Sequence, residues 1–138
     1  MHPILRHLLA LLAGWIAGSA VNMALVQVGF VVFPIPGLVP GDTEAMAEIM
    51  PTLEAQFFLF PFLAHALGTL VGAAIAATIA KNNKLRFAWV IGLLFLLGGI
   101  AASFMIPAPA WFVAVDLLLA YLPMAWLGGS LAIKRTQG

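Results

Sequence analysis

Four long runs of apolar residues dominate the chain and alternate with short polar segments. They cover about residues 8–33, 56–80, 87–106 and 111–133, and Asp116 is their only Asp, Glu, Lys or Arg. A helix rises 1.5 Å per residue, so about 20 apolar residues cross the ~30 Å hydrocarbon core of a bilayer. Continuous runs favour helices over a membrane barrel, which would show alternating segments of about ten residues. The pattern predicts an all-α integral membrane protein, a four-transmembrane-helix bundle forming one domain over residues 1–138.

The composition supports a lipid environment and removes several classes of function. Of the 138 residues, 64% are hydrophobic and 8% charged, against roughly 45–50% and about 25% in a soluble domain. The chain has no cysteine, which excludes disulfides, thiolate metal sites and iron–sulfur clusters. A net charge of +1 without a dense basic patch excludes nucleic acid as a partner. The first partner that the composition predicts is therefore the lipid bilayer.

The charged residues predict the orientation. The six basic residues lie before the first run, between the second and third, and after the fourth: Arg6, Lys81, Lys84, Arg86, Lys134 and Arg135. Four of the five acids lie in segment 34–55, which has no Lys or Arg: Asp42, Glu44, Glu48 and Glu54. Basic residues in short loops stay on the cytoplasmic side. We therefore expect both termini in the cytoplasm, segment 34–55 outside, and the protein in the plasma (inner) membrane.

The outer loop 34–55 carries the signals of a short helix. Pro34, Pro36 and Pro40 end the first span, because proline cannot continue a helix. Asp42 or Thr43 can then cap a helix over residues 44–50, with apolar residues on one face and acids on the other. This pattern predicts a short interfacial helix that lies over the bundle, either as a packing loop or as a gate.

Small residues predict how the first two spans meet. Gly14 and Gly18 are four residues apart in the first span, and Gly68 and Gly72 have the same spacing in the second. Helices in lipid associate through close packing of such residues. In an antiparallel hairpin, Gly18 would fall near Gly72, and Asn22 would fall near Gly68 and His65. We expect these glycines to form a helix-packing interface.

Few polar groups lie within the spans, and three of them share the small-residue sides of their helices: Asp116, His65 and Asn22. A charged side chain at a helix centre costs roughly 2.5–3.5 kcal/mol on insertion scales, so Asp116 needs a partner, a wet cavity or a neutral state. His65 is the expected partner, because an imidazole and a carboxylate can hold or relay a proton. Tyr121 and Gln27 are possible extra members, but each lies about 140° around its helix from Asp116 or Asn22.

The same residues could also be structural. A polar contact between membrane helices contributes about 0.6 kcal/mol on average, so an Asp116–His65 pair could simply hold two helices together. Pro123 leaves the carbonyl of Leu119 without its helical donor and predicts a bend in the fourth span. Two good ligands are too few for zinc, so we expect no metal site. No serine has a base at matching depth, and no phosphate-binding loop occurs. We therefore predict no catalytic residue and no cofactor.

Three functions stay open. The sequence most favours a non-enzymatic accessory or scaffold bundle, which self-associates as a homo-oligomer or joins a membrane protein partner. The second hypothesis is a small proton- or cation-coupled transporter that uses Asp116 and His65. The third is an intramembrane enzyme that acts on a lipid-like substrate. Native mass spectrometry would separate them, because it reports partner, oligomer and ligand together.

Overall fold

The computed structural model describes all 138 residues and contains helices but no strands. Four helical stretches are long and apolar enough to cross a membrane, which confirms the all-helical prediction: α1 (Pro3–Val32), η2 (Ala55–Phe58) continuing into α3 (Leu59–Ile79), α4 (Lys84–Met105), and α5 (Ala110–Leu119) with α6 (Leu122–Gln137). The α2 segment, residues 33–54, links α1 to η2 and contains α2 (Thr43–Ile49) and the 3₁₀ turn η1 (Met50–Thr52).

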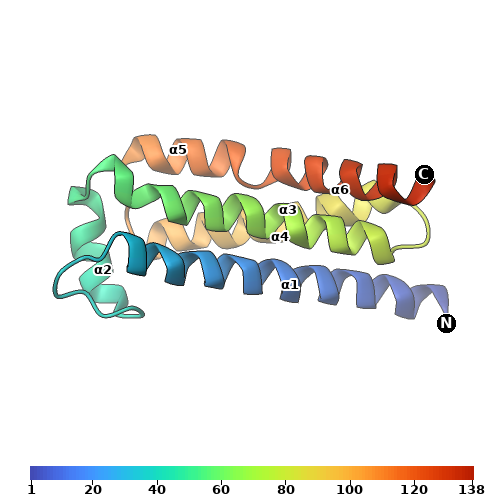
Figure 1. Cartoon of the computed structure of the whole chain (residues 1–138), viewed down its shortest axis with the longest axis horizontal. Coiled ribbons are helices and arrows are strands. Elements are labelled where there is room, and N and C mark those ends of the chain that lie inside the picture. Colours follow the sequence, from blue (N-terminus) through green and yellow to red (C-terminus); the bar gives the residue numbers. More distant parts are fainter.

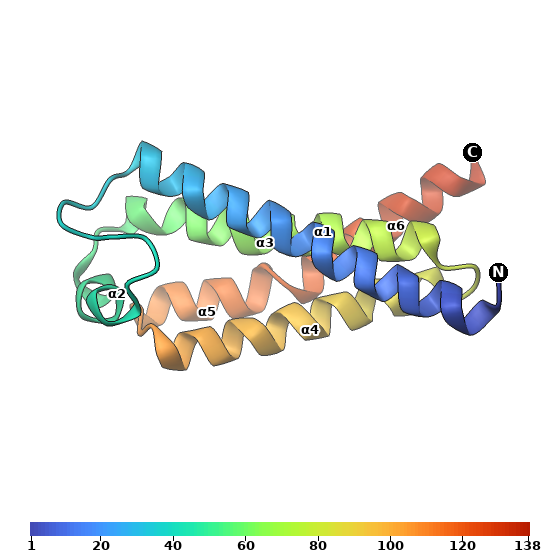
Figure 2. The same cartoon turned by 90° about the horizontal axis from the view of Figure 1, so that it is seen from below.

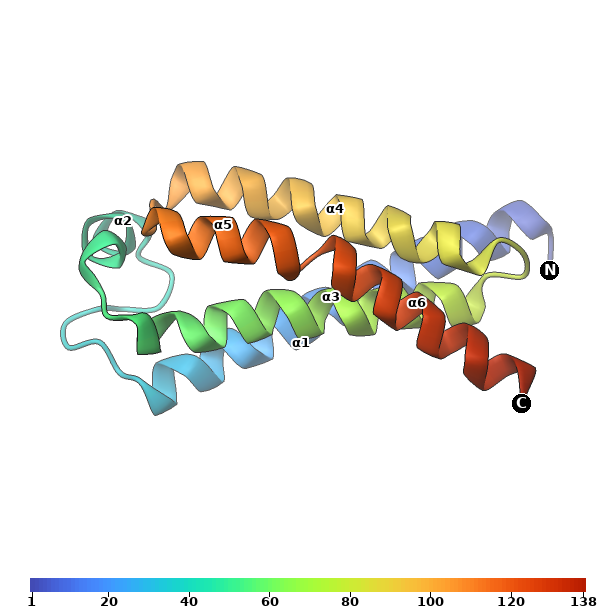
Figure 3. The ribbon, with the colours of Figure 1, turned by 90° about the horizontal axis from the view of Figure 1, so that it is seen from above.

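Helix α3 lies at the centre of the bundle. It packs against α1 along most of its length and also against α4 and α6 (Figure 1). Both termini and the α3–α4 loop lie at one end of the bundle, and α2 lies at the other (Figure 1). Towards the α2 end, the pair α1 and α3 diverges from the pair α4 and α5, as Figures 2 and 3 show from opposite sides. Most of the buried residues therefore lie in the half of the bundle nearer the termini, and the half nearer α2 is splayed.

The helices extend beyond the apolar runs that predicted them. Helix α1 begins at Pro3, and the side chain of His2 caps it by accepting a hydrogen bond from the amide of Ile4 at 3.4 Å. The polar residues before the apolar run also belong to this helix. Among them, Arg6 donates from Nε to the carbonyl of Ile79 at 2.6 Å. This contact satisfies a carbonyl in the last turn of α3, which has no partner within its own helix.

Glycines bring α1 and α3 into backbone contact. A Cβ atom built on Gly72 would lie 2.6 Å from the carbonyl oxygen of Gly14 and 3.3 Å from the Cα of Gly18. A Cβ on Gly68 would lie 2.8 Å from the carbonyl oxygen of Gly18 and 3.1 Å from the Cβ of Asn22. Gly72 therefore lies against Gly14 and Gly18, and Gly68 lies against Gly18 and Asn22, so a larger side chain would not fit at this interface.

Two further glycines bring α6 into close contact with α3 and α4. A Cβ on Gly128 would collide with the backbone carbonyl of Leu70 in α3, and one on Gly129 would lie 2.6 Å from the Cβ of Ala88 in α4. The residues buried between these three helices are mostly alanines, and together with Ile91 they form the main core cluster. Small side chains thus hold α6 tightly to α3 and α4.

The fourth long helix is broken in the middle. Helix α5 ends at Leu119, and α6 begins at Leu122 after Ala120 and Tyr121. Pro123 lies in the first turn of α6, where its missing N–H needs no helical acceptor. The break stands where the proline predicted a bend, and it interrupts the helix rather than curving it.

Candidate functional site

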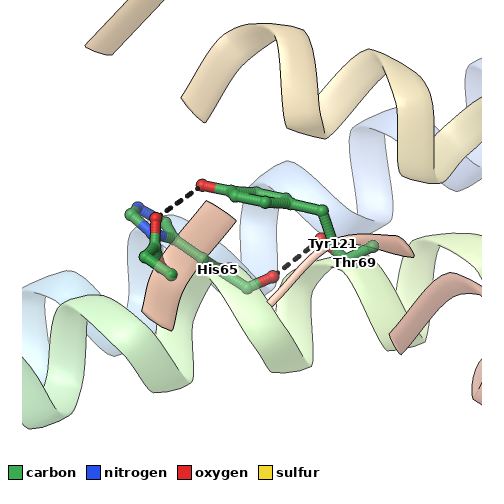
Figure 4. Close-up of polar contacts among 4 residues, drawn as sticks. His65, Thr69 and Tyr121 are labelled. Carbon is green, nitrogen blue, oxygen red and sulfur yellow. Dashed lines mark hydrogen bonds and ion pairs between the residues drawn. The ribbon is translucent and has the colours of Figure 1, made fainter. Parts of the chain in front are cut away.

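Asp116 is the centre of a hydrogen-bonded group of side chains. It lies on α5 one turn before the break, and only 5% of its surface is exposed. One carboxylate oxygen, Oδ1, lies 2.8 Å from Nδ1 of His65 on α3. The other oxygen, Oδ2, accepts a hydrogen bond from the Tyr121 hydroxyl at 3.1 Å. We call His65, Asp116 and Tyr121 the carboxylate cluster; Figure 4 labels His65 and Tyr121 and marks the hydrogen bond of the Tyr121 hydroxyl with a dashed line.

Tyr121 differs from its expected position. In a continuous helix it would point about 140° away from Asp116, but the structure directs both side chains into the bundle. The break at Ala120 changes the rotation between α5 and α6, so Tyr121 turns back towards the carboxylate. Its ring is buried, with 2% of its surface exposed, and stacks on the His65 ring at 5.7 Å between centroids. Tyr121 therefore contacts both other members of the cluster, Asp116 through its hydroxyl and His65 through its ring.

Thr69 supports the cluster and was not among the expected site residues. It lies one turn after His65 on α3, is fully buried, and donates from Oγ1 to the His65 carbonyl at 2.7 Å (Figure 4). This hydrogen bond satisfies the hydroxyl within its own helix, so Thr69 does not compete for the carboxylate. Its spacing of four residues from His65 is the sequence signal for such a contact.

Asn22 and Gln27 do not join the cluster. Asn22 packs against Gly68 across the α1–α3 interface, and the carboxylate of Asp116 takes its hydrogen bonds from other residues. Gln27 is exposed on α1, and its Nε2 lies 3.9 Å from the sulfur of Met23 one turn earlier. The structure thus brings together Asp116, His65 and Tyr121, and leaves the two amide side chains outside.

A cavity of about 270 Å³ lies in the splayed half of the bundle. Helices α1, α3, α4 and α5 form its walls, and the α2 segment covers its end with apolar side chains: Ile35, Met46, Met50 and Leu53. Five phenylalanines contribute most of the aromatic surface: Phe30, Phe33, Phe57, Phe60 and Phe112. Fifteen of the 21 lining residues are hydrophobic, and His65 and Asp116 are the only ionisable ones. The cavity therefore combines apolar walls with one hydrogen-bonded imidazole–carboxylate pair.

The His65–Asp116 pair can support only a few kinds of chemistry. Imidazole and carboxylate can share a proton or bind one polar group of a ligand. Ser103 also lines the cavity, but its hydroxyl donates to the carbonyl of Ile100 at 2.7 Å. No group of three or more His, Asp and Glu side chains comes close enough together to hold a metal ion. The arrangement suits proton or ligand binding better than nucleophilic chemistry.

Comparison with known proteins gives little further guidance. No known protein family matches the chain, and no solved structure matches it. A stretch of 78 residues is 32% identical to part of the tRNA 5-methylaminomethyl-2-thiouridine biosynthesis bifunctional protein MnmC of Polaromonas sp.. That match covers 51% of this chain and 12% of the curated relative, so it assigns the chain to no family.

Proposed function

We propose that the chain is an integral membrane protein of the plasma membrane with both termini in the cytoplasm. The four long apolar helices support insertion. The distribution of charge supports the orientation, because the segments that carry the six basic residues all lie at the end of the bundle that holds both termini (Figure 1). The α2 segment, which carries four of the five acids, would then face outward.

We further propose that the bundle binds an apolar small molecule in the cavity, with the polar end of that molecule at His65 and Asp116. The observation that carries this proposal is the cavity itself, whose hydrophobic walls surround a single buried carboxylate. Ligand sites typically combine such walls with a few polar groups that fix orientation. Binding of this kind is the first step that the transporter hypothesis requires, and a lipid-like substrate of an enzyme would occupy the same space.

Filling the cavity tests the proposal. Ala102 and its neighbour Ala101 on α4 are both exposed, but only Ala102 lines the cavity. Ala102→Phe should therefore block the site, and Ala101→Phe is the matched control of equal size on the same helix. We would measure binding of the neutral aromatic alcohol 1-naphthylmethanol to protein in lipid nanodiscs, with empty nanodiscs as the background for partition into lipid.

We expect saturable binding to the wild type and to Ala101→Phe, and a loss of at least about tenfold in Ala102→Phe, which corresponds to about 1.4 kcal/mol. Equal binding to all three proteins would show that the probe occupies lipid rather than the cavity, and would overturn the proposal.

A self-associating bundle, alone or with a membrane protein partner, is the second candidate. It is supported by Gly98 on α4, because a Cβ built there would meet no atom within 4 Å. A small residue on an exposed helix face allows a second helix to approach closely. Native mass spectrometry of gently extracted protein should then show a defined oligomer or a stoichiometric partner, whereas a lone monomer would contradict this role.

A further inference from the structure

We propose that the cavity selects small lipophilic cations, and in particular protonated amines, over neutral and anionic molecules of the same shape. This inference rests on the proposed function, because it names the class of ligand that the same cavity would bind.

The first argument is the charge around the cavity. Asp116 is the only acid in its walls, and neither Lys nor Arg lines it. No Lys or Arg occurs between Arg6 and Lys81, so α1 beyond its first turns, the α2 segment and α3 supply no cation. The basic segments lie at the far end of the bundle (Figure 1). Within the splayed half, only His65 could compensate a negative charge on Asp116.

The second argument is the hydrogen bonding of the carboxylate. With Asp116 ionised and His65 neutral, Nδ1–H of His65 donates to one oxygen and the Tyr121 hydroxyl donates to the other. Both bonds stabilise the carboxylate without cancelling its charge. A buried ion without a counter-ion is costly to hold in a low-dielectric interior. A bound ammonium group supplies the missing positive charge, whereas an anion would add to the unfavourable one.

The third argument is the aromatic wall. The five phenylalanines of the cavity present π-systems, whose negative faces attract cations. Phe33 packs edge-on against both Phe57 and Phe60 with 6.0 Å between ring centroids, which holds this part of the wall in a fixed arrangement. A ring face turned to the ligand would favour the same sign of charge as the carboxylate, and the carboxylate repels a carboxylate or phosphate ligand.

The fourth argument is the surface that covers the cavity. Asp42, Glu44 and Glu48 are exposed on the α2 segment, whose apolar side chains close the end of the cavity. An acidic surface next to a cavity raises the local concentration of cations. The acidic surface outside the cavity and the carboxylate inside it thus both favour cationic ligands.

A matched series of probes tests this inference. The compounds 1-naphthylmethylamine, 1-naphthylmethanol and 1-naphthoic acid share one ring system and are a cation, a neutral molecule and an anion at neutral pH. Each would be titrated against the full-length protein in nanodiscs of neutral lipid, with Ala102→Phe and Ala101→Phe as the cavity control pair. Asp116→Asn keeps the shape of the side chain and removes its charge.

We expect the amine to bind roughly tenfold or more tightly than the alcohol, and the acid to bind most weakly, as one charge-assisted contact would give. In Asp116→Asn, the amine and the alcohol should bind within about twofold of each other. The order of the three probes on the wild type tests the preference even where this variant does not fold. Equal binding of amine and alcohol, still blocked by Ala102→Phe, would overturn the cation preference while the proposed function stands. Binding that Ala102→Phe does not affect would remove both.

Discussion

The contact between α1 and α3 allows a quantitative prediction at Gly72. Replacing it by alanine adds one carbon that would lie 2.6 Å from the carbonyl oxygen of Gly14 and 3.3 Å from both the Cα of Gly18 and the Cγ2 of Ile91. Ordinary contact begins near 3.4 Å, so the oxygen is about 0.8 Å too close. This oxygen belongs to a helix backbone and cannot rotate away. The two helices must therefore separate along part of their length.

The expected cost follows from two opposing effects. Overpacking of a closely packed interface costs about 1–3 kcal/mol. Alanine in place of a helical glycine returns about 0.5–1 kcal/mol, because the unfolded chain loses less entropy on folding. We therefore expect Gly72→Ala to lower the free energy of unfolding by about 0–2.5 kcal/mol, and to be about 1–3 kcal/mol less stable than a variant with the same glycine-to-alanine gain and no overpacking. Gly98→Ala is the control: its new carbon meets no atom within 4 Å, so the variant should be as stable as the wild type or slightly more stable.

The assay is reversible unfolding by dodecyl sulfate in mixed micelles, followed by helicity and by tryptophan fluorescence. Trp15 on α1 lies next to Gly14 in the chain and is one of the four tryptophans that contribute to the fluorescence. The double variant Gly14→Ala with Gly72→Ala adds a further test. Once the helices have separated for one methyl group, the second should cost less than it does alone. The reasoning would be refuted if Gly72→Ala unfolded at the same denaturant fraction as Gly98→Ala.

Three further predictions concern single hydrogen bonds. Tyr121→Phe removes the donor to Asp116 but keeps the ring, and should lower the free energy of unfolding by about 1–3 kcal/mol in the same assay; an unchanged midpoint would show that this hydrogen bond adds no stability. Arg6→Gln removes the guanidinium that caps the end of α3, so the amides of the last α3 turn should exchange hydrogen faster while those of α4 do not change. Asp42→Ala removes the side chain that accepts a hydrogen bond from the amide of Ala45 at 3.1 Å, and such a helix cap contributes about 0.5–2 kcal/mol. Amide hydrogen exchange should become faster within α2 alone. A shift of the whole unfolding curve would contradict this local role.

The pattern of apolar residues and the spacing of small residues in the sequence are sufficient to predict much of the fold. Continuous apolar runs predict the four long helices, since length and hydrophobicity alone determine whether a helix can span a bilayer. The structure also gives Asp42 the capping role and pairs Gly14 and Gly18 with Gly72 and Gly68. These features depend on residues close together in sequence, or on two regular helices aligned by a short connection, so a simple geometric argument finds them.

Helical geometry alone is not sufficient to predict which residues form the carboxylate cluster. The phase angle that separated Tyr121 from Asp116 holds only in an unbroken helix, and the chain breaks at Ala120. Pro123 signals a bend but does not fix its rotation. Asn22 shares the small-residue side of α1, yet it faces Gly68 rather than Asp116. The cavity depends on the splay of two helix pairs, a tertiary property that no local pattern in the sequence describes.

The break at Ala120 and Tyr121 also has a mechanical consequence. Helix α6 is held closely against its neighbours, because Gly128 and Gly129 bring its backbone against α3 and α4. Helix α5 packs much less closely against its neighbours and carries Asp116 at its end nearest the break. A hinge at the break would lie between a closely packed half and a half with fewer contacts. A tilt of α5 about this hinge would move the carboxylate relative to His65 and change the width of the cavity, without disturbing the packing of the other half.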